Sequence, residues 1–172
     1  MTRHLVLVGL SGSGKTAAGR LAAAALDAPF HDIDALIEER EDVSISRIFA
    51  ERGEEAFRQL EREAVRRALE GMPAVIAPGG GWAAQPWSAE DAADRAILVY
   101  LRTSPQVAAA RVAREGNRPL LEGVDPVERL RQLLEEREAA YLTAPLLVET
   151  DARTVEEVAS ELVALARSRA GW

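Results

Sequence analysis

The chain contains no cysteine, which excludes a disulfide framework and a thiolate metal site. It also has no excess of positive charge, because 28 aspartates and glutamates against 21 lysines and arginines give a formal net charge of −7. A protein that binds nucleic acid independently of its sequence needs a basic surface, so we expect no nucleic-acid partner. The absence of cysteine is typical of a cytoplasmic protein, and we expect that location.

Long apolar segments are missing as well. No apolar run approaches the roughly 20 residues of a transmembrane helix, so we expect no membrane partner. An apolar segment of strand length already begins at residue 4, and we therefore expect no signal peptide. The remaining composition, with 48% hydrophobic residues in a chain of 172, suits one globular domain with a core of its own.

The most informative stretch is residues 9–16, GLSGSGKT, which match the phosphate-binding pattern G-x-x-x-x-G-K-[ST]. Its glycines let successive backbone N–H groups point at phosphate oxygens. Lys15 supplies a charge that reaches the β- and γ-phosphates, and the hydroxyl of Thr16 is placed to ligate Mg²⁺. An apolar segment precedes this phosphate loop and a helix-prone segment follows it, which favours the motif over a glycine-rich turn that binds nothing. The nucleotide-binding residues predicted from the loop are Gly12, Ser13, Gly14, Lys15 and Thr16.

Segments of strand length alternate with helix-prone segments, which predicts an α/β fold with a parallel sheet. Capping residues are expected at Asp34, Ser44 and Ser88. Since ligands bind beyond the carboxyl ends of parallel strands, the segments after the first three strands should meet at one edge. The expected strands are about 4–8, 29–32, 74–77, 96–101 and 146–149. The expected helices are about 15–26, 35–41, 45–51, 54–70, 88–93, 104–114, 127–141 and 154–169.

Two of these segments carry acceptor-side chemistry. Asp32 and Asp34 follow the second strand: the first can orient Mg²⁺, and the second can accept a hydrogen bond from a substrate hydroxyl. The alternative is that Asp34 is only a helix cap and Asp32 only a solvated strand end. Three consecutive glycines at 79–81 follow the third strand and suggest close approach of backbone N–H groups to a ligand, although a flexible turn is the alternative.

Three arginines are candidate anion ligands. Arg58 lies beside an apolar helical stripe and three residues before Glu61, where a surface ion pair is the plain alternative. Arg137 lies among glutamates, which is typical of a solvated helix face. Arg118 belongs to an aperiodic loop over 115–123, where a cation above a triphosphate can neutralise developing charge.

Taken together, these motifs resemble shikimate kinase over essentially the whole chain. The specific parts, in order, are the phosphate loop, Asp32-x-Asp34, Gly53-Glu54-x-x-Phe57-Arg58-x-x-Glu61, the three glycines, Arg118-Pro119-Leu120-Leu121 and Arg137-x-x-x-Tyr141. The resemblance implies a three-layer P-loop fold in which helices flank a five-stranded parallel sheet. It also implies a single domain over 1–172, with a substrate-binding helical region at about 33–61 and a short lid at about 113–124.

The resemblance further implies ATP- and Mg²⁺-dependent transfer to the 3-hydroxyl of shikimate in aromatic amino-acid biosynthesis, by a cytoplasmic monomer. Asp34 would bind the acceptor hydroxyls and act as base, with Lys15 and Arg118 as the other catalytic residues. Thr16 and Asp32 would serve Mg²⁺. The remaining roles implied are the shikimate carboxylate for Arg58 and Arg137, backbone contacts to substrate for Gly80 and Gly81, and packing on adenine for Arg111.

The sequence departs from the family pattern at three positions. Trp82 stands where the family usually has a small residue, and it could narrow the acceptor site or point outward. Pro78 removes one backbone N–H, and Ala17 stands where a second hydroxyl residue is common. Two alternatives therefore remain open at this stage: a kinase of the same fold for a gluconate-type sugar acid or an aminoshikimate, and a relative that binds nucleotide without catalysis.

Overall fold

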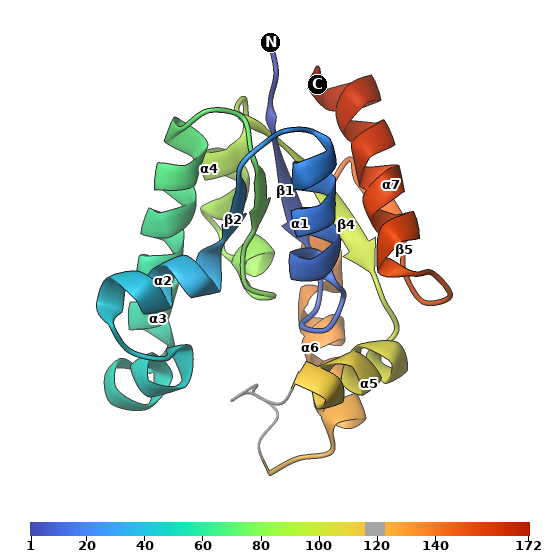
Figure 1. Ribbon diagram of the computed structural model, residues 1–172. Helices are drawn as coiled ribbons and strands as arrows, with labels where there is room; N and C mark the ends of the chain where they lie inside the picture. The colour runs from blue at the N-terminus through green and yellow to red at the C-terminus, as the bar shows by residue number, and fades with distance from the viewer. Residues whose placement is uncertain (116–122) are drawn as a thin grey trace.

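The computed structural model describes residues 1–115 and 123–172, and its centre is a sheet of five parallel strands (Figure 1). The strand order is β2-β3-β1-β4-β5, and every pairing is parallel. This arrangement confirms the predicted fold class, and β1 and β5 have the predicted bounds. The strands are β1 His4–Val8, β2 Phe30–Asp32, β3 Val75–Ala77, β4 Ala96–Arg102 and β5 Leu146–Glu149.

Helices follow the strands along the chain. They are α1 Lys15–Ala25, α2 Ile33–Glu41, α3 Ile45–Glu70, α4 Ser88–Ala92, α5 Pro105–Glu115, α6 Pro126–Tyr141 and α7 Val155–Leu165. Two shorter helical turns, η1 Trp82–Ala84 and η3 Ala166–Ala170, were not expected as separate elements. None of the helices in the described ranges is both long and apolar enough to cross a membrane.

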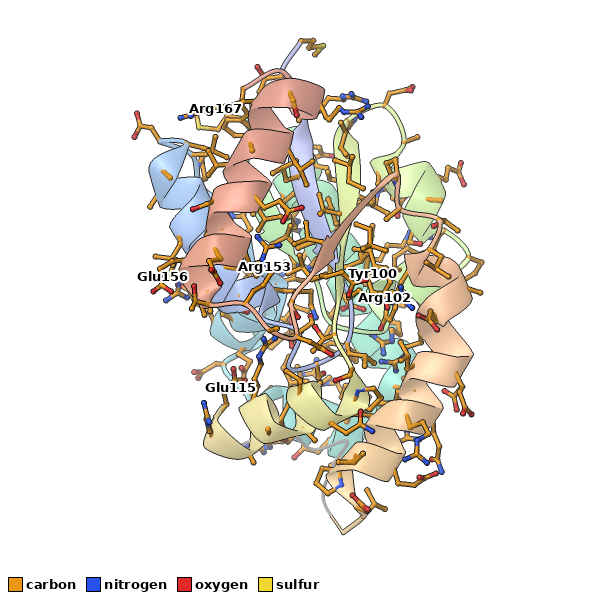
Figure 2. All side chains as sticks on the ribbon, turned by 90° about the vertical axis from the view of Figure 1, so that its right-hand side faces the viewer. Tyr100, Arg102, Glu115, Arg153, Glu156 and Arg167 are labelled. Atoms are coloured by element: carbon orange, nitrogen blue, oxygen red, sulfur yellow. The ribbon has the colours of Figure 1, made fainter. Side chains whose placement is uncertain are left out.

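The helices form a layer on each face of the sheet. Because side chains alternate along a strand, Leu5 and Leu7 of β1 join one apolar cluster with α1 and α7. Val6 and Val8 join a second cluster with α3 and α6. Figure 2 views the molecule from the β5 side, with α7 and α1 on one side of the sheet and α6 on the other. These three layers agree with the predicted architecture.

The start of α2 corrects one expectation. Asp34 is not the helix cap, because Asp32 has the extended backbone that precedes the helix, and its Oδ1 accepts from Ala35 N–H at 3.2 Å. The helix consequently begins at Ile33, and Asp34 lies in its first turn. The alternative in which Asp34 serves only as a helix cap is therefore excluded.

The expected cap at Ser88 is a second expectation that the structure corrects. Ser88 does not cap α4, because its hydroxyl donates to the carbonyl oxygens of Ala83 and Gln85 instead. The predicted helix end at Gly53 is confirmed as a break in the helical backbone, because this residue has φ 84° and ψ 172° within α3. Glycine tolerates that left-handed backbone, so two helical segments continue across it.

Candidate active site

The phosphate loop joins β1 to α1 and needs glycine at a defined point. Gly12 has φ +82°, and a Cβ atom there would lie 2.4 Å from the carbonyl oxygen of Ala108 on α5. Lys15 is buried at the start of α1, and its Nζ donates to the carbonyl oxygens of Gly9 (2.7 Å) and Leu10 (2.8 Å). The ammonium group is therefore held inside the curve of the loop, at the N-terminus of a helix that attracts anions.

Arg111 places a second positive charge beside this loop. Its Nη2 donates to the carbonyl oxygen of Thr150 at 2.9 Å, and its Nη1 to the Thr150 hydroxyl at 3.1 Å. The same Nη1 lies 3.4 Å from the carbonyl oxygen of Ser13. These contacts fix the guanidinium group next to the predicted nucleotide. Arg118, the predicted lid arginine, lies outside the described residues.

Thr16 and Asp32 meet across the beginnings of two helices. The hydroxyl of Thr16 donates to Asp32 Oδ2 at 3.1 Å. Together with Lys15, Asp34 and Gly80, these two residues line one small cavity at the carboxyl ends of β1, β2 and β3. The structure therefore brings the predicted phosphate, metal and acceptor residues to a common edge of the sheet.

The triple-glycine loop (residues 79–81) borders this cavity and is contacted by two carboxylates. A Cβ atom on Gly79 would lie 3.4 Å from Asp34 Oδ1 and 2.6 Å from Glu61 Oε1. Glu61 Oε1 accepts a hydrogen bond from the backbone N–H of Gly79 at 2.9 Å. Asp34 and Glu61 thus face the same glycine from α2 and α3.

Arg58 and Glu61 form a buried ion pair rather than the surface pair considered from sequence. Arg58 Nη1 lies 2.7 Å from Glu61 Oε2, and the two side chains are 8% and 0% exposed. Burial raises the pKa of Glu61, and the adjacent Arg58 opposes that shift. Burial also disfavours the charge of Arg58, but Glu61 and Glu54 together outweigh burial and raise the arginine pKa. Sequence reasoning named Glu61 beside Arg58 but gave it no role in the site, because its spacing from Arg58 was visible and its burial was not.

The guanidinium group of Arg58 packs directly on the glycine loop. A Cβ atom on Gly81 would lie 2.2 Å from Arg58 Nη2 and 2.7 Å from Cζ. Any larger residue at position 81 would displace this arginine. Within residues 1–115 and 123–172, Arg58 Nε is buried and has no hydrogen-bond partner. One N–H group of the buried guanidinium thus remains to be satisfied.

Arg137 and Tyr141 reach the same loop from α6. A Cβ atom on Gly80 would lie 3.4 Å from Arg137 Nη1, and the Tyr141 hydroxyl donates to the carbonyl oxygen of Gly80. Burial raises the pKa of Tyr141 to about 12 even though Arg137 lowers it. The phenol therefore stays protonated at neutral pH, and Arg137 faces the site rather than forming part of a purely solvated helix face.

Gly80 is where the two sides of the site touch. A Cβ atom there would lie 3.3 Å from the backbone nitrogen of Ser11 and 3.4 Å from the carbonyl oxygen of Gly9. Only one glycine therefore separates the phosphate loop from Arg137. A small acidic molecule held by the arginines would lie next to a bound triphosphate.

Trp82, the main departure from the family pattern, is completely buried. Its ring meets Trp87 edge-on, with centroids 6.5 Å apart. The expectation that the indole could point outward is therefore wrong. Trp82 is also absent from the lining of the cavity beside Lys15.

Comparison with known proteins places this geometry in a family. The profile of the shikimate kinase family matches residues 11–167. A shikimate kinase from Caldanaerobacter subterraneus subsp. tengcongensis is 37% identical over 161 residues, which cover 94% of this chain and 94% of that protein. The structure of shikimate kinase from Acinetobacter baumannii in complex with shikimate has a TM-score of 0.92 and 34% identity. It covers 98% of this chain and 94% of that chain.

A gluconokinase from Sinorhizobium meliloti also shares the fold, with a TM-score of 0.62 and 20% identity over 99% of this chain and 94% of that chain. At that identity the likeness extends to the fold alone. The profile match includes the acceptor-side segments and residues 11–16 of the phosphate loop, and the 37% identity extends over 94% of the chain. The chain therefore belongs to the shikimate kinase family.

Proposed function

We propose that this kinase transfers the γ-phosphoryl group of ATP to the 3-hydroxyl of shikimate, in aromatic amino-acid biosynthesis. ATP is the co-substrate of the family. The observation that carries the proposal is the approach of two guanidinium groups, from α3 and α6, to one glycine loop beside the phosphate loop. Shikimate is a small polyol with one carboxylate, and a planar carboxylate suits arginine forks.

Arg58 is the main carboxylate ligand in this proposal. Its Nη1 is taken by Glu61, but its Nε has no partner among the described residues. Its Nη2 contacts Glu54 at 3.2 Å, and Glu54 is 62% exposed, so that pair contributes little. A substrate carboxylate can thus take the Nε–Nη2 edge, with Arg137 as the second cation.

Phosphoryl transfer depends mainly on positioning and charge neutralisation. Lys15 neutralises charge on the transferred phosphoryl group, and the backbone N–H groups of residues 12–16 bind the phosphates. Asp34 accepts the proton of the attacking hydroxyl as the new P–O bond forms and the bond to ADP breaks. Gly80 and Gly81 contact the acceptor through the backbone.

Mg²⁺ is part of the proposal, and Thr16 and Asp32 would hold it. Their oxygens lie 3.1 Å apart at the cavity beside Lys15, and hard oxygen donors suit this ion. Within the described chain no cluster of three histidines or carboxylates occurs, but Mg²⁺ bound with phosphates needs only one or two protein ligands. When bound, the ion neutralises phosphate charge.

The proposal includes the remaining expectations. The chain acts as one domain over 1–172, with an acceptor-binding region at about 33–61 and a lid at about 113–124 that carries Arg118. Arg111 packs on adenine. The protein works as a cytoplasmic monomer. It has no nucleic-acid partner, which its net charge of −7 supports.

An acceptor panel tests the proposal. A coupled ATP assay with Mg²⁺ compares kcat/KM for shikimate, for gluconate and for a shikimate analogue without the carboxylate. We expect shikimate to exceed both by at least about 10⁴-fold, because a site that pairs polar groups with a substrate rejects analogues that lack them. No turnover with millimolar shikimate, or a preference for gluconate, would contradict the proposal.

A further inference from the structure

Trp82 begins η1 immediately after the triple-glycine loop, and hydrogen bonds at both ends of η1 connect it to that loop. Its backbone N–H donates to the carbonyl oxygen of Gly79 at 3.1 Å, which closes the loop into a turn. Gln85 Nε2 donates to the carbonyl oxygen of Gly81 at 3.1 Å, so the other end of η1 holds the same loop. The indole is 0% exposed and belongs to the apolar cluster that α3, α4 and α6 share.

The contacts behind Trp82 connect it to two helices. Its ring packs edge-on against Trp87, at an interplanar angle of 68°. Trp87 in turn lies under the guanidinium group of Arg62, 5.0 Å from the ring centroid. Arg62 holds Asp91 of α4 through two hydrogen bonds, of 2.7 and 3.3 Å. The indole is thus the end of a chain of contacts that ties η1 to α3 and α4.

The helices that contact η1 also carry the two proposed carboxylate ligands. Arg58 on α3 packs on Gly81, and Arg137 on α6 lies beside Gly80. The glycine loop is therefore the spacer between the two guanidinium groups, and Trp82 is the bulky residue that anchors it. The Trp82 Nε1 atom is buried without a hydrogen-bond partner in the described ranges, so its contribution is packing.

We propose that Trp82 is a positioning residue for the acceptor: a buried wedge that sets the distance between Arg58 and Arg137 through the glycine loop. This inference rests on the proposed function. Trp82 acts on the substrate carboxylate only through the arginines, so it governs the acceptor KM and the preference for carboxylate-bearing acceptors. The phosphate loop lies on the other side of Gly80, and although its Leu10 belongs to the same apolar cluster as Trp82, the ATP KM should change much less than the acceptor KM.

The test compares Trp82→Ala with Trp82→Phe, and uses Trp172→Phe as the matched control. Trp172 packs in the opposite apolar cluster and donates Nε1 to the carbonyl oxygen of Arg3. We expect Trp82→Ala to raise the shikimate KM about tenfold with the ATP KM changed less than about twofold, since small misplacements of binding groups are costly. Trp82→Phe keeps an aromatic wedge and should recover most of this loss.

A second readout separates positioning from general stability. We expect Trp82→Ala to lower kcat/KM for shikimate but to leave that for a carboxylate-free analogue unchanged, because the analogue never used the arginines. Equal losses for both acceptors, or an unchanged shikimate KM in both variants, would overturn the inference. If the alanine variant fails to fold, Trp82→Leu and Trp82→Phe give the same comparison. Lack of shikimate turnover by the unaltered protein would instead contradict the proposed function, and the acceptor found by the panel would then decide the role of Trp82.

Discussion

The nucleotide side and the acceptor side of the site are built in different ways. The proposed nucleotide side is the phosphate loop, eight consecutive residues, 9–16, of which Ser11, Gly12, Gly14, Lys15 and Thr16 line the cavity. The proposed acceptor side gathers three side chains from three different helices, Asp34, Arg58 and Arg137, around the glycine loop, and these residues are spread over more than a hundred positions of the chain. The first depends on local backbone conformation and the second on tertiary packing. Substitutions on the two sides should therefore change different kinetic constants.

The largest expected effect is on the nucleotide side. Lys15→Met should lower kcat by about 10³-fold, because the charge that stabilises the transferred phosphoryl group is lost. Arg167→Met is the control, since this arginine lies on η3 far from the site (Figure 2). Steady-state kinetics and thermal unfolding should show lost turnover with the fold retained. Unchanged activity would mean that the loop does not cradle the phosphates.

The matching acceptor-side change is Arg58→Ala. We expect the shikimate KM to rise about 100-fold, because loss of a desolvated charge-assisted contact costs about 2–3 kcal/mol. The ATP KM should stay within about twofold. Arg67→Ala, an exposed position on the same helix, is the control. A parallel rise of both KM values would make Arg58 a structural residue and remove the contrast between the sides.

Adding one methyl group to a glycine on each side of the site tests the same contrast. Gly81→Ala pushes Arg58 aside and should raise the shikimate KM about tenfold, whereas Gly12→Ala strains the phosphate loop and should raise the ATP KM instead. Gly71→Ala is the control, because its nearest contact would be an ordinary 3.4 Å. If Gly81→Ala altered only the ATP KM, the assignment of the glycine loop to the acceptor would be wrong.

Chemical labelling of Lys15 probes the nucleotide side without a substitution. Lys15 is the single lysine of the chain, so an amine-directed acylating reagent can modify one side chain and the α-amino group of Met1. ATP at ten times its Kd should slow Lys15 labelling about tenfold by occupancy, and shikimate alone should not. Intact and peptide mass spectrometry measure both sites, with Met1 as the internal standard. Protection by shikimate alone would mean that the two sides are not separate.

The smallest expected effect is on the pH dependence of stability, and it comes from His4, which lies outside both sides of the site. His4 is buried in β1, burial lowers its pKa below 6.5, and its Nδ1 accepts from Ala74 N–H at 3.2 Å. The unfolded state then binds the proton more readily, so stability is full above pH 6.5 and falls as pH drops toward the folded pKa. Urea unfolding at pH 7.5 and 5.5 should show this loss, and His4→Gln should reduce it. An identical pH dependence in the variant would contradict the assignment.

The same contrast explains what could be predicted from sequence. Strands and long helices carry recognisable apolar patterns: an apolar run in β1 and β5, and a helical period of apolar residues in the long helices. The bounds of these elements were therefore predicted closely. The phosphate loop is contiguous, and its pattern therefore identified it directly. The start of α2 was misplaced because two aspartates compete as caps, and only backbone geometry selects Asp32.

On the acceptor side, Asp34 and the glycine loop were proposed from their own residues, but the carboxylate-binding role of the two arginines was predictable only through family resemblance. The ordinary interpretation was a surface ion pair for Arg58 and a solvated helix face for Arg137. Nothing local reveals that tertiary packing buries the first and turns the second toward Gly80. Glu61 and the buried position of Trp82 likewise follow from how α3, α6 and η1 pack together. Such contacts between distant segments have no signature in a single sequence.

The most direct test of the account is the position of the phosphoryl group in the product. The purified protein is incubated with shikimate, Mg²⁺ and ATP labelled in its γ-phosphoryl group, and the products are resolved by phosphorus NMR and mass spectrometry. We predict one phosphorylated product, 3-phosphoshikimate, which carries the label in step with ADP release. Label found only in inorganic phosphate, or on another hydroxyl of shikimate, would contradict the proposed meeting of the two sides at Gly80.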